Sequence, residues 1–284
     1  MSKVYLVTGC SAGLGYHLSK AILSAGHKLI ATSRDPSKTA EVVNEIQSLG
    51  GYWGKLDVTS PDLDSQFREL LKVYGRVDVL INNAGIAIGC TVEQADMQTA
   101  RLVFETNFFG VMRLTQLVIP LMRSQGDGTI VNISSGTTLN PNPMLSVYGA
   151  SKYAIEGFTE ALKKELASFH IRVILAHPGG IRTSFANRSA VTEPREEYRG
   201  TAAEAVMNSI QSRVGKEPID PAKAAGIIVD AVDGTGMLQK LAGKDYFRLP
   251  IGQDIAKSMK EKSEELTSSM ETFHEICQSA DFKD

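Results

Sequence analysis

The chain has 284 residues, 43% of them hydrophobic, which is enough to build one large domain or two smaller ones. Its formal net charge of -2 lacks the basic excess of nucleic-acid-binding proteins, so we expect no nucleic-acid partner. The three cysteines, Cys10, Cys90 and Cys277, lie far apart without metal-ligand spacing, which argues against a zinc site or a disulfide framework and favours a reducing compartment.

Short apolar runs alternate with helical stretches through about the first 180 residues. Runs of this length, bounded by Gly, Asp or Pro, are typical of parallel strands that are buried on both faces. The repeated β–α units predict an α/β fold: a single domain with a doubly wound, Rossmann-type parallel sheet and helices on both faces. In chain order we expect strands within 4–9, 27–33, 51–58, 77–85, 128–134 and 171–179, and helices over 14–25, 37–49, 63–74, 97–123 and 147–168.

The regular alternation ends near residue 184, where a polar segment begins. We interpret residues 184–215 as a mobile excursion that forms a substrate lid. A helix is expected near 221–233, with Asp220 as its N-cap and Pro221 at its first position.

The remaining chain suggests a strand-like piece followed by an amphipathic helix over 253–277. We expect the apolar stripe of this helix to pack on the same domain, since such stripes usually face a core. The expected organisation is a catalytic domain over 1–236, including the lid, and a C-terminal extension over 237–284. The stripe consists of Ile255, Met259, Leu266, Met270, Phe273 and Ile276.

Two features bear on cellular location. A strand-like run begins at Val4, which leaves no room for a signal peptide. The longest apolar stretch, residues 102–122, is interrupted by polar and charged side chains and is expected to be a buried helix, with no membrane span. We therefore expect a cytoplasmic protein.

A glycine-rich turn joins the first expected strand to the first expected helix, in the stretch TGCSAGLG at 8–15. Gly9 can adopt backbone angles that a side chain forbids. Gly13 allows the backbone to approach a phosphate closely, and Gly15 allows the helix to pack tightly on the sheet. The helix N-terminus then offers free N–H groups and a positive dipole end to a pyrophosphate.

With this turn the chain resembles the short-chain dehydrogenase/reductase family, whose nucleotide motif is TGxxxGxG. The resemblance covers about residues 3–185, and its motifs occur in order. The stretches FETNFFGVMRLTQ and YGASKYAIEGFTEALKKEL look most like the hydroxysteroid-dehydrogenase-like branch. The further matching motifs are Asn82-Asn83-Ala84-Gly85 after the fourth strand, Asn107 in the long helix, Ser135 placed 13 residues before Tyr148, Lys152, and Pro178-Gly179 with Thr183.

Tyr148 and Lys152 lie four residues apart, so on a helix they project side by side. Reduction of a carbonyl requires a proton donor and a stabiliser of the developing negative charge. A nearby ammonium favours the phenolate, which lowers a tyrosine pKa from its usual value of about 10. We therefore assign Tyr148 as the general acid in reduction and the base in oxidation.

The resemblance implies roles for the other catalytic residues. Lys152 would also hold the nicotinamide ribose, and Ser135 would hydrogen-bond the substrate oxygen. The 13-residue spacing to the tyrosine favours Ser135 over its neighbour Ser134. Asn107 would help to position a water in a proton relay to Lys152. No metal is expected.

The end of the second strand bears on the choice of cofactor. An acidic residue there would bind the adenosine ribose of NAD and repel a 2′-phosphate. Here Ser33 replaces the acid and Arg34 follows, and a hydroxyl beside a guanidinium suits a phosphate, although Asp35 weakens the case. The sequence predicts NADP(H). The expected cofactor contacts are Gly9, Ser11, Gly13, Leu14, Gly15, Ser33, Arg34, Asp57, Val58, Asn83, Ala84, Gly85, Tyr148, Lys152, Pro178, Gly179, Ile181 and Thr183.

The substrate is less well defined. Apolar residues in 136–147 and in the lid predict an apolar, medium-to-large carbonyl or alcohol, such as a steroid, a retinoid, a long-chain ketone or a polyketide-type metabolite. Reduction of an imine, or a non-catalytic NADP-binding sensor or scaffold, remains an alternative. Relatives commonly form oligomers through the helices expected at 97–123 and 147–168, so a homodimer and a homotetramer are both possible assemblies. The expected substrate-pocket residues are Leu139, Met144, Leu145 and Phe185.

Overall fold

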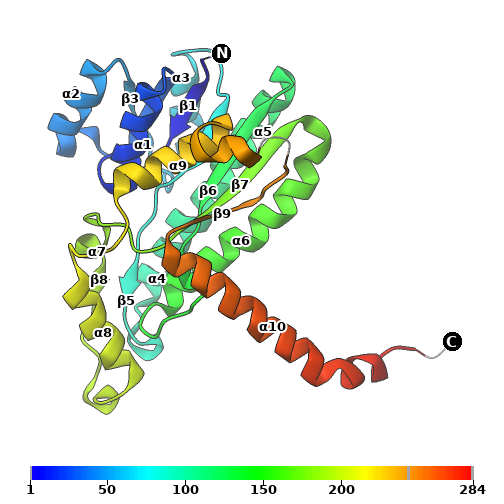
Figure 1. Ribbon diagram of the computed structural model, residues 1–284. Helices are drawn as coiled ribbons and strands as arrows, with labels where there is room; N and C mark the ends of the chain where they lie inside the picture. Colours follow the sequence, from blue (N-terminus) through cyan, green and yellow to red (C-terminus); the bar gives the residue numbers. More distant parts are fainter. Residues whose placement is uncertain (1, 242–243, 283–284) are drawn as a thin grey trace.

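Seven parallel strands form the central sheet of the protein, in a computed structural model that describes residues 2–241 and 244–282 (Figure 1). The strand order is β3-β2-β1-β4-β6-β7-β9, so the chain builds outward in one direction and then crosses back to extend the other side. This is the predicted doubly wound fold. The strands are β1 (Val4–Val7), β2 (Lys28–Ser33), β3 (Tyr52–Lys55), β4 (Val79–Asn82), β6 (Gly128–Ile133), β7 (Ile171–Pro178) and β9 (Arg248–Ile251).

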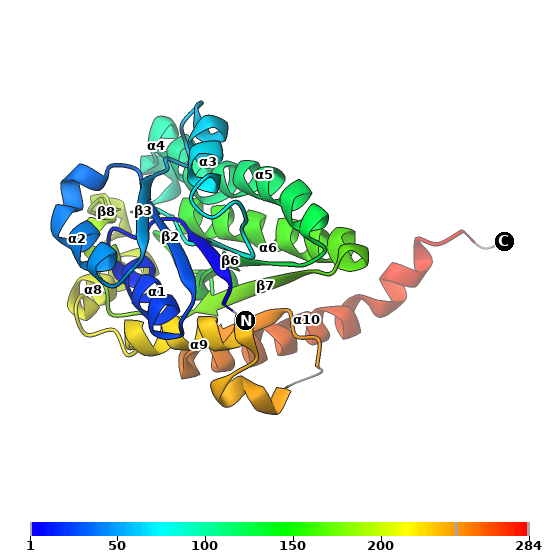
Figure 2. The same ribbon diagram turned by 90° about the horizontal axis from the view of Figure 1, so that it is seen from above.

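Helices cover both faces of this sheet, as the view from above shows (Figure 2). Alternate residues of one strand enter different cores: Tyr5 and Val7 pack with α1, α2 and α9, whereas Leu6 packs with α3, α5 and α6. The central strands are therefore apolar throughout, as the sequence indicated. The helices are α1 (Gly13–Ser24), α2 (Ala40–Ser48), α3 (Leu63–Leu71), α4 (Met97–Phe104), α5 (Gly110–Gln125), α6 (Ser146–Leu166), α7 (Phe185–Arg188), α8 (Ala202–Arg213), α9 (Pro221–Asp233) and α10 (Gln253–Ser279).

The long helix expected at 97–123 is interrupted by one π-helical turn over Glu105–Phe109, which separates α4 from α5. Such turns insert an extra residue into the helical hydrogen-bond ladder and occur frequently at functional sites. The continuous stretch 97–125 is long and apolar enough to cross a membrane, a test that core helices also pass. Here Leu114 and Val118 are fully buried against the sheet.

The segment expected to be a lid contains its own short elements. β8 (Ala190–Val191) pairs with β5 (Ile88–Gly89), and α8 follows. Helix α9 then begins as predicted, because the Asp220 carboxylate accepts hydrogen bonds from the N–H groups of Ala222 and Lys223.

The C-terminal extension adds β9 to the sheet edge beside β7, and α10 then leaves the body of the molecule (Figures 1 and 2). Of the expected apolar stripe only Ile255, in the first turn of α10, is buried. Leu266, Met270, Phe273 and Ile276 are each more than half exposed. The expectation that this stripe packs on the domain is therefore wrong, because the helix axis points away from the sheet.

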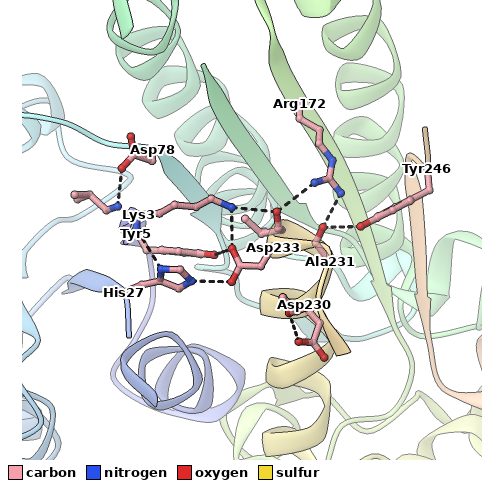
Figure 3. A network of polar contacts seen from close by, with 12 residues as sticks. Lys3, Tyr5, His27, Asp78, Arg172, Asp230, Ala231, Asp233 and Tyr246 are labelled. Carbon is pink, nitrogen blue, oxygen red and sulfur yellow. Dashed lines mark hydrogen bonds and ion pairs between the residues drawn. The ribbon is translucent and has the colours of Figure 1, made fainter. Parts of the chain in front are cut away.

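A polar network at the amino-terminal edge of the sheet ties distant segments together (Figure 3). The Asp233 carboxylate, at the end of α9, accepts hydrogen bonds from Lys3 Nζ at 2.8 Å and from Tyr5 Oη at 3.2 Å. His27 Nε2 lies 2.7 Å from the same carboxylate. Burial raises the pKa of Asp233, but the hydrogen bonds from Lys3 and His27 outweigh it and hold that pKa below its usual value. The network therefore fastens α9 to β1 and β2.

Candidate active site

The carboxyl ends of β1, β2, β4, β6 and β7 surround a cavity of about 480 Å³. Ligands of doubly wound sheets bind in this crevice, near the point where the strand order reverses. The volume lies in the range of sites that hold small molecules and cofactors. The cavity is thus the candidate site, and the predicted motifs can be located against it.

The glycine turn after β1 has the conformation that its sequence predicts. Gly9 and Gly13 have φ values of 71° and 57°, in the left-handed region that favours glycine. A Cβ atom on Gly15 would lie 2.3 Å from the Gly9 carbonyl oxygen. The N-cap of α1 is Ala12, which offers no side-chain acceptor, and no acidic residue lies in the first helical turn. The free N–H groups at this end fit a pyrophosphate.

The segment Asn83-Ala84 braces this turn from the neighbouring strand. Thr8 Oγ1 accepts hydrogen bonds from the N–H groups of Asn83 and Ala84, both at 3.0 Å. Asn83 Nδ2 donates in return to the carbonyl oxygens of Thr8 at 2.8 Å and Gly9 at 3.1 Å. A Cβ atom on Gly9 would lie only 2.8 Å from Ala84 Cα, so the close approach requires glycine. The Asn83-Ala84 segment therefore fixes the backbone of the glycine turn after β1.

Asn107 lies in the π-helical turn and is fully buried. Its Oδ1 accepts from the Ile86 N–H at 2.9 Å, and its Nδ2 donates to the Ile86 carbonyl at 2.9 Å and to Ser151 Oγ at 3.0 Å. The side chain thus fixes Ile86, which lines the cavity, against α6. The predicted water relay from Asn107 to Lys152 stays a prediction.

Tyr148 and Lys152 lie side by side on α6, as their spacing predicted. Lys152 Nζ donates to the Ile133 carbonyl at 2.8 Å and lies 5.9 Å from the centroid of the Tyr148 ring. Burial lowers the pKa of Lys152 to about 8. A Cβ atom on Gly85 would lie 3.7 Å from this ammonium, so Gly85 leaves space beside it.

The protonation of Tyr148 differs from the sequence expectation. The side chain is buried, and burial raises its pKa above the usual value, although a hydrogen bond with Ser135 opposes this rise. The lowering of this pKa that the sequence predicted from Lys152 is therefore not found, because desolvation of the phenolate dominates. At neutral pH the phenol therefore keeps its proton, which is the state that a general acid needs.

The two adjacent serines at the end of β6 have different partners. Ser134 Oγ donates to Glu156 Oε1 at 2.8 Å inside the protein. Ser135 Oγ accepts from the Thr137 N–H at 3.3 Å and contributes to the pKa of Tyr148. Ser134 thus donates its proton to a carboxylate, whereas Ser135 lies beside Tyr148; the choice of Ser135 as the serine that binds the substrate oxygen stays a prediction.

Ser33 and Arg34 lie at the opposite end of the cavity, after β2. Ser33 is buried and accepts a hydrogen bond from Trp53 Nε1 at 3.2 Å, while Arg34 is exposed. The Asp35 carboxylate instead caps the next short helix by accepting from the Ser37 N–H at 3.2 Å. Asp35 is not among the residues that line the cavity.

The structure brings together the expected cofactor residues, and all but Gly15 line the cavity; Gly15 lies beneath the turn. Of the expected substrate-pocket residues, Phe185 lines the cavity with its ring centroid 6.1 Å from that of Tyr148. Leu139, Met144 and Leu145 do not line it, which corrects that expectation. Met144 is buried against Ala203 and Met207 of α8, because the lid helix packs on that loop.

Sequence reasoning missed several lining residues, since no motif marks them. Ile86, Ala87, Thr106 and Ile133 approach through tertiary packing, and Arg188 and Ser189 come from the end of α7. Only the proximity of α7 to Thr183 in sequence could have suggested the last two. Across residues 2–241 and 244–282 no group of His, Cys, Asp and Glu side chains could hold a metal ion.

Comparison with known proteins defines the class. The short chain dehydrogenase family profile matches residues 3–194, and the chain belongs to that family. It is similar to the oxidoreductase claN of Passalora fulva, with 40% identity over 73% of this chain and 95% of the other. It is also similar to a 3-ketodihydrosphingosine reductase of Bacteroides thetaiotaomicron, with 38% identity over 69% of this chain and 71% of the other.

Solved structures agree. A short-chain dehydrogenase from Streptomyces avermitilis superimposes with a TM-score of 0.86 and 31% identity, covering 99% of this chain and 100% of that one. Two structures at 25% identity carry cofactors: a 3-ketoacyl-(acyl-carrier-protein) reductase from Brucella melitensis with NADH (TM-score 0.71, covering 88% of this chain and 96% of that one) and a serine dehydrogenase with NADP+ (TM-score 0.70, 87% and 94%). A nicotinamide cofactor is thus supported for this oxidoreductase fold.

Proposed function

We propose that this protein is an NADP(H)-dependent reductase of an apolar, medium-to-large ketone, which also oxidises the corresponding secondary alcohol. The observation that carries the proposal is the surroundings of the buried Tyr148, which has Lys152 on the next helical turn and a hydrogen bond with Ser135. These three residues line the same cavity as the glycine turn after β1. The bound nicotinamide supplies the hydride. The residues of this chain supply the proton, the charge stabilisation and the orientation.

The protein's own contribution begins with binding. The N–H groups at the start of α1 hold the pyrophosphate, and Ser33 and Arg34 hold the 2′-phosphate. Lys152 holds the ribose through its ammonium. Ser135 donates a hydrogen bond to the carbonyl oxygen, and Tyr148 donates its proton to the same oxygen as negative charge develops there. In oxidation Tyr148 accepts the proton, which requires the phenolate and therefore favours higher pH.

The lining of the cavity favours a carbonyl over an imine. Asp57 is the one carboxylate among the lining residues in the described part of the chain, and the resemblance assigns it to the adenine end. A protonated imine would gain from a carboxylate beside its nitrogen, and Tyr148 faces Phe185 instead. The similarity to a 3-ketodihydrosphingosine reductase supports a ketone as the substrate.

The test has two arms. Fluorescence titration should give a lower Kd for NADPH than for NADH, and NADPH oxidation should be observed with at least one member of a panel of steroid, retinoid and long-chain ketones. Cyclic imines complete the panel. Preference for NADH would contradict the assignment of Ser33 and Arg34. NADPH binding without turnover of any ketone, or turnover of imines alone, would contradict the proposed reaction.

A further inference from the structure

A buried carboxylate lies directly behind the catalytic pair and has no role in the mechanism above. Glu156 belongs to α6, one helical turn after Lys152, and only 8% of the residue is exposed. Its Oε1 accepts from Ser134 Oγ at 2.8 Å and lies 2.8 Å from His177 Nε2. Its Oε2 accepts from Arg248 Nη1 at 2.9 Å.

These partners connect Glu156 to the ends of β6 and β7, which build the site, and to the first residue of β9. Ser134 precedes Ser135, and His177 precedes Pro178, which lines the cavity. Lys152 donates to the carbonyl of Ile133, the last residue of β6, and Glu156 bonds to Ser134, the residue that follows it. Arg248 is contributed by β9, in the C-terminal extension.

The charges around Glu156 nearly balance. Arg248, whose side chain is 30% exposed, also pairs with the half-exposed Glu160 on α6. His177 is fully buried, and its Nε2 lies 3.1 Å from Arg248 Nη1 as well as beside Glu156, whereas its Nδ1 has no partner among the described residues. Helix α6 also carries Tyr148 and Lys152, and Asp254 at the start of α10 contacts the Gly180 N–H through its carboxylate. The remaining titratable groups on α6 and β7 are Tyr153, Lys163, Lys164, Glu165 and Arg172.

We propose that the Glu156–Arg248 ion pair is a positioning and charge-balancing element for the catalytic pair, so that the C-terminal extension sets the electrostatic potential at Tyr148. Glu156 holds the strand end that carries Ser135, and Arg248 cancels the negative charge that Glu156 would otherwise present to Lys152 and Tyr148. The proposal rests on the proposed function for its catalytic meaning, but the ionisation of Tyr148 can be measured without a substrate.

Removal of Arg248 and removal of Glu156 should shift the pKa of Tyr148 in opposite directions. Arg248→Met leaves the Glu156 carboxylate uncompensated, which disfavours a phenolate and raises the pKa of Tyr148. Glu156→Gln leaves the Arg248 cation uncompensated, which lowers the pKa of Tyr148. With an effective dielectric constant of about 20, one uncompensated unit charge in the neighbourhood of a titrating group shifts its pKa by on the order of one pH unit. The double variant should return close to wild type.

The experiment is a pH titration of the purified full-length protein, followed by the absorbance of tyrosinate. Each protein is compared with its own Tyr148→Phe version, so that the difference reports Tyr148 alone among the eight tyrosines. Lys163→Met is the matched control, because it removes one cation from the same helix that also pairs with the extension, through Asp245, at 2.6 Å. It should leave the titration of Tyr148 unchanged.

Opposite shifts in the two single variants, with recovery in the double variant, would support the proposal. Shifts of the same sign, or no shift while circular dichroism shows folded protein, would overturn it, since a purely structural role predicts no such sign reversal. If Arg248→Met does not fold, Arg248→Gln replaces it, and Arg248→Lys should titrate like wild type. Failure to bind NADPH would contradict the proposed function and leave this titration interpretable.

Discussion

Replacement of Gly15 by alanine separates the role of the glycine turn from ordinary helix propensity. Gly15 lies in the first turn of α1, where alanine would normally stabilise a helix by about 1 kcal/mol over glycine. Here the new Cβ would meet the Gly9 carbonyl oxygen at 2.3 Å and Asn83 Nδ2 at 2.6 Å. Because the first contact is with backbone, the turn itself has to move.

Overpacking of this kind costs roughly 1–3 kcal/mol, which outweighs the gain in propensity. We expect Gly15→Ala to lower the free energy of unfolding by up to about 2 kcal/mol. The N–H groups that hold the pyrophosphate would move with the turn, so NADPH affinity should fall at least tenfold, which corresponds to about 1.4 kcal/mol of binding free energy.

Urea denaturation and NADPH fluorescence titration measure the two effects. Gly226→Ala is the matched control: Gly226 also lies inside a helix, α9, but its Cβ would meet no atom within 4 Å. The control should gain about 0.5–1 kcal/mol and keep its NADPH affinity. If Gly15→Ala is as stable as the control and binds NADPH normally, the close packing described for the turn is wrong.

Three further predictions concern other parts of the molecule. Arg34→Leu should weaken NADPH more than NADH, and Ser33→Asp should reverse the preference, as competing titrations of the two cofactors would reveal. Asp233→Asn should destabilise the fold by roughly 1–3 kcal/mol in urea, through lost hydrogen bonds to charged groups, yet leave the Kd for NADPH unchanged, because the network lies at the other edge of the sheet. Burial raises the pKa of Glu156, but the hydrogen bonds with His177 and Ser134 outweigh this effect and bring that pKa to about 2, from an ordinary 4.5. Its contribution to stability, on the order of 3 kcal/mol, should be complete above pH 4.5 and lost as the pH falls toward 2, and Glu156→Gln should flatten this acid limb of a urea-monitored stability profile.

The parts of the site that sequence predicts are those set by local geometry. The turn around Gly9, Gly13 and Gly15 follows from where a strand becomes a helix, and the Tyr148–Lys152 pair follows from the helical repeat. Each of these two features depends on only a few consecutive residues, so the local sequence pattern is enough to predict its geometry.

Long-range packing accounts for what the sequence did not predict. Periodicity identifies Leu266 and Phe273 as sharing one helix face, but it does not say whether anything covers that face. The sequence predicts Met144 to be a pocket residue, because it does not reveal that α8 packs on this side chain. Glu156 stands at a visible spacing from Lys152, yet its partner Arg248 is 92 residues away, and only the pairing of β9 with β7 brings it close.

In the proposed function Tyr148 donates the proton, while the surrounding residues bind the cofactor. The direct measurement compares wild type with Tyr148→Phe for NADPH affinity and for NADPH-dependent turnover of the best ketone in the panel. Loss of the general acid should lower the turnover number by about 10²- to 10⁴-fold, while the Kd for NADPH changes little, because the phenol oxygen alone is removed. A variant that retains wild-type turnover would contradict the mechanism.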